Sequence, residues 1–326
     1  MGIFMKTILL SSNDIKTAAE LLLNGEIVAV PTETVYGLAA NALNANSVAK
    51  IFTAKGRPQD NPLIVHIAGR HQLYNLVENV SDTAVKLMDA FWPGAITMVF
   101  PASPIVPSVV TAGLATVAVR LPSHPVMLDI IKAAGVPFAA PSANCSGLPS
   151  PTRAEHVLDD LDGKIAAVVD GGACDIGVES TVLDVSGETP RILRIGGVGQ
   201  SDIERVLNMK IALDTNGGDK PSSPGQKYRH YAPKTPLTVL EDGDPGIHID
   251  RDNETVVYLC PAERANMFKK HIVYGSLSEP ESLARGLYSA LREADKSGAE
   301  RIIAVCPKGE CFAAVRDRLY RAGMDN

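Results

Sequence analysis

Residues 27–67 hold the pattern that most limits how this chain can fold. The first predicted strand, Ile27–Val30, ends at Pro31, which cannot donate a hydrogen bond to a sheet ladder. Apolar residues then recur at helical spacing until Gly56, a residue that commonly ends helices. A second apolar strand is expected at Leu63–Ile67. Two buried strands joined through a helix predict an α/β sheet, in which ligands bind where strands end.

The chain continues to alternate strands and helices up to about residue 209, which predicts a first domain at 1–209. Further strands are expected at residues 96–100, 116–122, 136–140, 165–170, 180–185 and 191–195. Helices are expected to begin near Asn13, Ser81 and His124. Two more helices are expected to begin at capping boxes, one formed by Thr152 with Glu155 and the other by Ser201 with Glu204.

Residues 210–235 are rich in Gly, Pro, Ser and Asp and are predicted to form a linker. Four apolar strands then alternate with a helix at 279–296 and another after Gly309. This pattern predicts a second, smaller α/β domain at 236–326 with a largely parallel sheet.

Composition excludes several classes of protein. The net charge of −6 provides no overall basic field for nucleic acid or an anionic membrane. Five cysteines without a CxxC pair make a disulfide framework improbable. The apolar run in residues 1–13 is too short for a signal peptide, and no run of about 20 apolar residues could span a bilayer. We therefore expect a protein of the reducing cytoplasm.

Two clusters of residues are candidates for binding phosphate, since the chain has no GxxxxGK[ST] loop. Lys55 and Arg57 follow a helix and could grip phosphate oxygens, or could simply interact with the helix dipole, which is worth about 0.3–1 kcal/mol. Ser142 and Asn144 follow a strand and could orient backbone amides toward phosphate, or could form an ordinary turn.

Four polar residues near the ends of apolar strands could bind an amino acid. Arg120 could hold a carboxylate, and Thr34, His66 and Ser180 offer donors and acceptors for a hydroxyl group. The alternative is that they are structural hydrogen bonders. A serine hydrolase is disfavoured because the chain has no G-x-S-x-G motif.

The motifs PTETVYGL, KGRP, NPLIVHI and APSAN resemble those of the YrdC-like family, specifically the long, two-domain threonylcarbamoyl-AMP synthases. The resemblance covers roughly residues 10 to 235. It implies an open, twisted, mixed sheet and a smaller Rossmann-like α/β C-terminal domain. It also implies a nucleotidyltransferase that converts L-threonine, bicarbonate and ATP into threonylcarbamoyl-adenylate and pyrophosphate. A downstream transferase complex would use this product to modify a tRNA adenosine.

The resemblance also implies roles for individual residues. Lys55 and Arg57 would be catalytic, Mg²⁺ would arrive with ATP, and no residue would ligate a metal of its own. The residues implied to bind ATP are Arg57, Asn61, Thr116, Ser142, Asn144, Ser150, Arg194 and Tyr231. Those implied to bind threonine are Thr34, His66, Arg120, the backbone of Ala140, and Ser180. The linker motif at 223–233 would lie over the catalytic cleft as a lid that excludes water.

Two rival interpretations stay open at this point. A double-stranded RNA-binding protein without catalysis would need a local basic stripe, against the acidic net charge. A carbamoyltransferase subdomain of the hydrogenase-maturation type shares the YrdC-like fold. Those proteins carry zinc-finger-like and acylphosphatase segments, and this chain has no CxxC pair and no room for such segments before Ile27.

Overall fold

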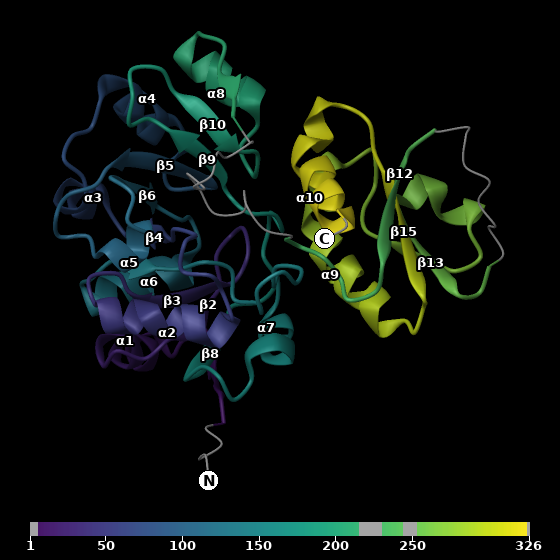
Figure 1. The fold of residues 1–326 in the computed structure, drawn as a ribbon, viewed down its shortest axis with the longest axis horizontal. Helices are drawn as coiled ribbons and strands as arrows, with labels where there is room; N and C mark the ends of the chain where they lie inside the picture. Colours follow the sequence, from purple (N-terminus) through teal and green to yellow (C-terminus); the bar gives the residue numbers. More distant parts are fainter. Residues whose placement is uncertain (1–5, 215–229, 244–252, 325–326) are drawn as a thin grey trace. The chain divides into compact units, whose positions relative to one another are not determined.

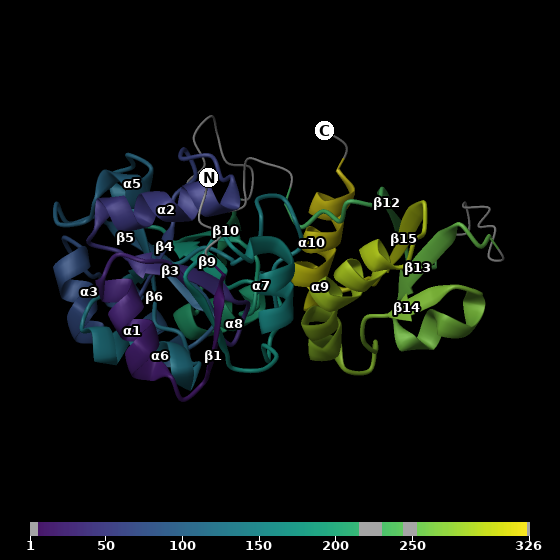
Figure 2. The same cartoon turned by 90° about the horizontal axis from the view of Figure 1, so that it is seen from below.

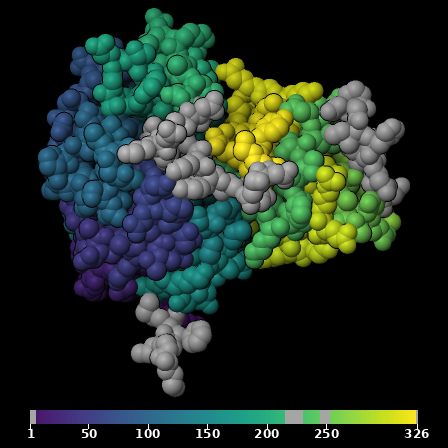
Figure 3. All heavy atoms as spheres, in the orientation of Figure 1, coloured from purple at the N-terminus to yellow at the C-terminus, as the bar shows by residue number. Residues whose placement is uncertain are grey.

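The computed structural model describes residues 6–214, 230–243 and 253–324, which are coloured in Figure 3. The described residues form two compact units. The first unit contains residues 6–146, 151–174 and 179–214. The second contains 147–150, 175–178, 230–243 and 253–324.

The first unit is built on a mixed β-sheet (Figure 1). Its strands are β1 (Ile8–Ser11), β2 (Val28–Val30), β3 (Gly37–Asn41), β4 (Ile64–His66), β5 (Ile96–Pro101), β6 (Thr116–Arg120), β7 (Phe138–Ala139), β8 (Ala167–Asp170), β9 (Thr181–Asp184), β10 (Arg191–Arg194) and β11 (Ala212–Leu213). They are ordered β1-β8-β2-β3-β7-β4-β6-β5-β9-β10-β11. The sheet contains parallel pairs such as β4 with β6 and antiparallel pairs such as β6 with β5. The predicted open mixed sheet is confirmed.

Helices lie on both faces of this sheet (Figure 2). They are α1 (Ile15–Leu23), α2 (Ala45–Lys55), α3 (Arg70–Leu76), α4 (Asp82–Phe91), α5 (Ser108–Thr111), α6 (Pro125–Ala134), α7 (Ala154–Leu161) and α8 (Gln200–Leu207). On one face, Leu22 of α1 and Ile130 of α6 pack against Val28 and Phe138. On the other face, α2 and α4 join a larger core around strands β4 and β6. The buried helix residues recur at the 3.6-residue period that the sequence showed.

The second unit contains a fully parallel sheet, as predicted for the C-terminal domain. Its strands are β12 (Leu237–Glu241), β13 (Val256–Cys260), β14 (His271–Val273) and β15 (Arg301–Cys306), in the order β12-β15-β13-β14. Its helices are α9 (Pro280–Lys296), α10 (Ala313–Gly323) and the short 3-10 helices η1 (Ala262–Met267) and η2 (Glu310–Phe312). The parallel order with helical crossovers is the Rossmann-like arrangement that the resemblance implied.

Both predicted capping boxes are wrong. Helix α7 begins after Arg153, and Thr152 instead contacts the ring of His156 through its backbone N–H, 3.3 Å from Nδ1. Helix α8 begins after Gly199 without a side-chain cap, and Glu204 instead accepts a hydrogen bond from the backbone N–H of Ile211. Thr152 therefore lies one position before the N-cap of α7, and Glu204 binds a backbone amide beyond the end of α8.

Of the predicted linker at 210–235, the structure describes residues 210–214 and 230–235. The first of these parts includes β11, which pairs with β10. The lid motif at 223–233 lies outside the described residues except for its last four positions. In the described ranges, every helix is too short or too polar to cross a bilayer.

Candidate functional site

Two of the predicted threonine residues, His66 and Arg120, lie in one row across a single face of the first sheet, together with Arg194, which was predicted to bind ATP. Residues that pair across neighbouring strands point to the same side of a sheet. His66 pairs with both Phe138 and Arg120, and Val182 pairs with both Thr97 and Arg194. Strands β5 and β6 are antiparallel and Met98 pairs with Val119, so Thr97 lies opposite Arg120. The complete row is Phe138, His66, Arg120, Thr97, Val182 and Arg194.

This face has two halves. Phe138 belongs to the core under α1 and α6, so these helices cover the half nearest to it. Beyond it, the apolar residues of the same face form a cluster of strand residues only, namely Ile64, Val99, Ala118, Val182 and Leu193. The polar residues of the row lie along one edge of this cluster. The second half is therefore an apolar floor edged with donors and acceptors, which is the usual composition of a small-molecule site.

Two further predicted residues extend the floor along the strands. The backbone N–H of Ala140 donates to the carbonyl oxygen of Ile64 at 2.9 Å. Ile64 lies two residues before His66 in β4, on the same face of the sheet. Thr116 is the first residue of β6 and is half-buried. At about 3.3 Å per residue, it lies about 13 Å from Arg120 along the strand.

Arg120 is 3% exposed and already has three partners. Its Nη2 lies 2.8 Å from Oε1 of Glu33, its Nη1 donates to Oγ1 of Thr34 at 2.9 Å, and its Nε donates to the carbonyl oxygen of Gly94. Burial raises the pKa of the Glu33 carboxyl, but the charge and hydrogen bonds of Arg120 outweigh this and leave it below its usual value. Glu33 and Arg120 thus form a buried ion pair within the site.

His66 is neutral in this environment. Burial, reinforced by the positive charge of Arg120, lowers the pKa of His66 to about 3. Its Nδ1 lies 3.3 Å from the carbonyl oxygen of Ile64, which can only accept, so we assign the proton to Nδ1. The imidazole is therefore a neutral hydrogen bonder rather than a cation at physiological pH.

Ser180 and Arg194 contact each other at the far end of the row. Nη2 of Arg194 donates to the carbonyl oxygen of Ser180 at 2.9 Å and lies 3.3 Å from its Oγ. The Ser180 hydroxyl is also 2.8 Å from that of Thr97. Predicted threonine and ATP residues are thus joined directly at this point.

The segment Pro141–Asn144 is held by Lys55 and by β3. The ammonium of Lys55, the last residue of α2, donates to the carbonyl oxygens of both Ser142 and Asn144. Leu38 donates to the carbonyl oxygen of Pro141 at 2.8 Å, and Ser142 forms a bridge with Gly37. The Lys55 ammonium therefore fixes the conformation of the predicted phosphate loop.

Arg57 and Asn61 lie close together before β4. Nη2 of Arg57 donates to the carbonyl oxygens of Asn61 and Pro62 at 3.4 and 3.2 Å. Asn61 is 1% exposed, and its Oδ1 has no hydrogen-bond partner among the described residues. A buried amide oxygen without a donor is costly, so this position suits a donor supplied by a ligand.

Ser150 and Tyr231, the remaining predicted ATP residues, are described with the second unit. Both are buried. Sequence reasoning assigned no role to two other buried residues in the row's network, Glu33 and Thr97. The polar run Thr32-Glu33-Thr34 was a signal for the first, but an isolated threonine inside an apolar strand gave no signal for the second.

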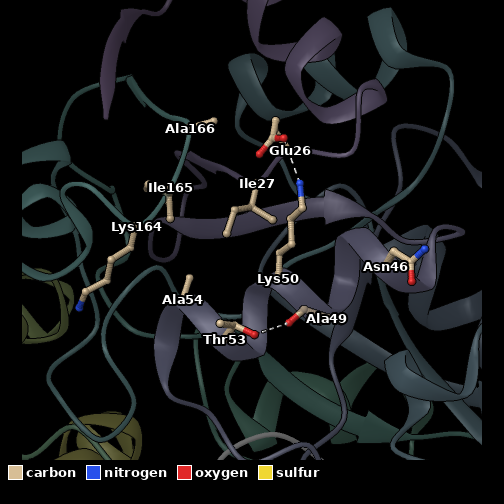
Figure 4. Close-up of a pocket in the computed structure, with 10 residues that line it drawn as sticks. All are labelled: Glu26, Ile27, Asn46, Ala49, Lys50, Thr53, Ala54, Lys164, Ile165 and Ala166. Atoms are coloured by element: carbon tan, nitrogen blue, oxygen red, sulfur yellow. Dashed lines mark hydrogen bonds and ion pairs between the residues drawn. The ribbon is translucent and has the colours of Figure 1, made fainter. Parts of the chain in front are cut away.

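A separate pocket of about 570 Å³ lies between α2 and the segments before β2 and β8 (Figure 4). Its wall includes Ile27, Ala54 and Ile165, and Lys50 at its rim is paired with Glu26 at 3.0 Å. It contains none of the predicted site residues. In the described residues, no group of three His, Cys, Asp or Glu side chains is placed to hold a metal ion.

Family comparisons match nearly the whole chain. Residues 20–196 match a Sua5/YciO/YrdC family model described as telomere recombination. Residues 198–323 match one described as the C-terminal domain of threonylcarbamoyl-AMP synthase. The chain is 47% identical to the threonylcarbamoyl-AMP synthase of Bacillus subtilis over 96% of this chain and 94% of that protein. It is 44% identical to that of Pyrococcus abyssi, over 94% and 93% of the two chains.

Solved structures agree with these matches. The crystal structure of P. abyssi Sua5 complexed with L-threonine matches with a TM-score of 0.86 and 38% identity, over 97% of this chain and 98% of that one. Full-length HypF in a phosphate- and nucleotide-bound form matches with a TM-score of 0.51 and 22% identity, over 57% of this chain and 29% of that one. The second likeness shows a shared fold alone.

Proposed function

The chain belongs to the threonylcarbamoyl-AMP synthase family in its two-domain form, and we propose that it makes threonylcarbamoyl-adenylate and pyrophosphate from L-threonine, bicarbonate and ATP. In this proposal it is a nucleotidyltransferase of the cytoplasm. A downstream transferase complex then uses the product to modify a tRNA adenosine.

The threonine side of the site is the row around Arg120. An arginine has five N–H donors; Nε and Nη1 of Arg120 each donate one hydrogen bond, and the Nη2 group pairs with Glu33 by charge, which leaves at least two N–H donors. We assign two of these to the substrate carboxylate. Thr34, neutral His66 and Ser180 then provide hydrogen bonds for the substrate hydroxyl and amine, with the Ala140 backbone beside them.

The ATP side includes the phosphate loop and the residues around it. We assign Arg57 and Arg194 to the triphosphate charge, Ser142 and Asn144 to its oxygens, and Asn61 and Thr116 to the rest of the nucleotide. Ser150 and Tyr231 complete the proposed set. Lys55 contributes by holding the loop carbonyls, so that the loop amides and side chains are oriented before the nucleotide binds.

The chemistry needs little from the protein beyond position and charge. Bicarbonate supplies CO₂ and a hydroxide ion. The threonine amine bonds to the carbon of CO₂, and the amine proton combines with the hydroxide to form water, which leaves a carbamate. A carbamate oxygen then attacks the α-phosphorus of ATP. The bond between the α-phosphorus and the oxygen that bridges it to the β-phosphorus breaks, and pyrophosphate leaves. Because the nucleophile is already an anion, we assign no general base, and catalysis depends on alignment and on neutralising phosphate charge.

Mg²⁺ is the expected companion of ATP. The described side chains offer no cluster of acidic or histidine ligands for a metal of their own. We therefore propose that Mg²⁺ arrives bound to the triphosphate and keeps several waters. No step above is assigned to it.

The observation that carries the proposal is the shared row, in which Arg120 and Arg194 flank one apolar floor through Thr97 and Ser180. The test is pyrophosphate release with threonine, bicarbonate and ATP supplied together and with each omitted in turn. We expect release only with all three. Release that does not depend on threonine would refute the proposal. No observation favours RNA binding without catalysis, for which the net charge of −6 is unsuitable.

A further inference from the structure

Two short segments from the N-terminal part of the sequence pack with the second unit. They are Gly147–Ser150 and Asp175–Val178. The first ends at Ser150, which is proposed to bind ATP. The second is followed after one residue by Ser180, which is proposed to bind threonine. Both segments belong to the second unit, and the chain itself connects them to residues that are proposed to bind substrate.

Arg292 of α9 holds the first segment. Its Nη2 donates to the carbonyl oxygen of Pro149 at 2.5 Å, and the residue is only 8% exposed. The backbone N–H of Ala232 donates to the carbonyl oxygen of Gly147 at 2.9 Å. A buried charged donor fixes the peptide immediately before Ser150.

Arg285 of α9 holds the second segment. Its Nε donates to the carbonyl oxygen of Asp175 at 2.8 Å. Gly177 has a φ of +81°, and a Cβ at this position would lie 2.4 Å from Cα of Arg285 and 2.6 Å from the carbonyl oxygen of Ala284. The close approach of the two backbones therefore requires glycine.

Tyr231, a third residue that is proposed to bind substrate, also packs against α9. Tyr231 has a φ of +64°, which is unfavourable for a residue with a large side chain. Its ring centroid lies 5.6 Å from that of Tyr288, a fully buried residue of α9. From α10, the guanidinium of Arg318 lies 5.1 Å from the centre of the Tyr231 ring.

Arg285, Tyr288 and Arg292 are spaced i, i+3 and i+7, so they lie on one face of α9. One helix thus contacts Tyr231 and the two segments of its own unit that lead to Ser150 and Ser180. We propose that this face of α9 positions the substrate residues, with Arg285 acting on the threonine side and Arg292 on the ATP side. This inference rests on the proposed function, and it gives the second unit a role in substrate affinity.

The test compares two variants of the full chain that should affect different substrates. Arg285→Met should raise the KM for threonine by about three- to tenfold, because one hydrogen bond to the segment before Ser180 is lost. Arg292→Met should raise the KM for ATP by about tenfold or more, since it leaves a buried carbonyl without its donor. Each variant should change the KM for the other substrate less than about twofold.

Matched controls come from the same unit. Arg301→Met removes an arginine that donates to Oγ1 of Thr238 instead, and should leave both KM values unchanged. Gly177→Ala is the second variant on the threonine side. Its control, Gly298→Ala, replaces a glycine with a φ of +71° whose added Cβ would meet no atom within 4 Å. Only the first of these two should weaken threonine binding.

The outcomes separate this inference from the proposed function. If the wild-type chain lacks threonine-dependent pyrophosphate release, the proposed function fails. If the wild type is active but Arg285→Met and Arg292→Met raise both KM values equally, or only lower the melting temperature, α9 is merely structural and the inference is overturned. Since Arg285 is exposed, its variant should fold even if Arg292→Met does not.

Discussion

Replacing Arg120 by methionine, with and without a change at Glu33, tests whether Arg120 binds substrate or only neutralises its neighbour. The two side chains are 4% and 6% exposed and lie 2.8 Å apart. In Arg120→Met the Glu33 carboxylate stays buried without its charge partner. Removing one member of a buried pair typically costs about 3–5 kcal/mol of unfolding free energy.

The double variant Arg120→Met with Glu33→Gln should recover most of that stability. No charge is then left unpaired, and replacing a buried ion pair by neutral groups of similar volume is often close to neutral. Threonine affinity should not recover. A hydrogen bond to a charged group contributes about 1.5–3 kcal/mol, which corresponds to a rise of about 10- to 150-fold in the KM for threonine.

The assays are urea unfolding at pH 7.5 and pyrophosphate release as a function of threonine concentration. Glu33→Gln alone is the matched control, since it keeps Arg120 and changes only its partner. The reasoning would be refuted if the double variant recovered both its stability and a KM within about threefold of the wild-type value. Arg120 would then serve only to compensate Glu33.

Three further predictions concern other residues of the proposed site. Lys55→Met should raise the KM for ATP by about tenfold, because the carbonyls of Ser142 and Asn144 lose their shared donor. The KM for threonine should change little, and steady-state kinetics measure both values. Because the folded-state pKa of His66 lies at about 3, below its unfolded value near 6.5, stability should fall as pH drops below 6.5, by about 1.4 kcal/mol per unit. His66→Gln should flatten this dependence in urea titrations between pH 7 and 5, and an unchanged slope would contradict the assignment. Because the pKa of Glu33 is lower in the folded state than its usual value of 4.5, ionised Glu33 stabilises the fold at pH values above 4.5. This contribution should be lost as the pH falls below 4.5 through the folded-state pKa. Glu33→Gln should lack that loss in acid-unfolding curves.

Strong periodicity made most elements predictable. The helix with Ile51 and Phe52 ends at Gly56, which adopts the left-handed conformation, and Ser81 caps α4 through the backbone N–H of Ala84. Local spacing was less reliable where tertiary partners compete. Glu204 bonds to Ile211 rather than closing a capping box, because the chain after α8 returns past its side chain.

The site was predictable as a set of residues but not as an arrangement. The sequence showed polar residues near strand ends, yet His66 and Arg120 end their strands while Thr116 begins one. Their common face follows from the strand register, which depends on long-range pairing. The partners of Arg120 were equally hidden, because Glu33 and Gly94 are distant from it in sequence.

The coverage of the sheet explains why this face can be both buried and functional. Helices α1 and α6 cover one half of it, and the other half presents an apolar cluster edged with polar side chains. Such side chains would be costly there without partners, but Arg120 contacts Glu33 and Thr34, and Ser180 contacts Thr97 and Arg194, before any substrate is present. Their rotamers are therefore fixed before substrates bind, which reduces the side-chain entropy lost on binding and keeps the charges aligned for phosphoryl transfer.

Removing one hydrogen bond from either network should therefore reduce substrate affinity even where the substituted residue does not contact a substrate. Thr97→Val tests this expectation, because it removes the hydroxyl that contacts Ser180. Its KM for threonine should rise by about three- to tenfold while the apolar core around it is retained. An unchanged KM in a folded Thr97→Val protein would show that the network does not set the geometry of the site.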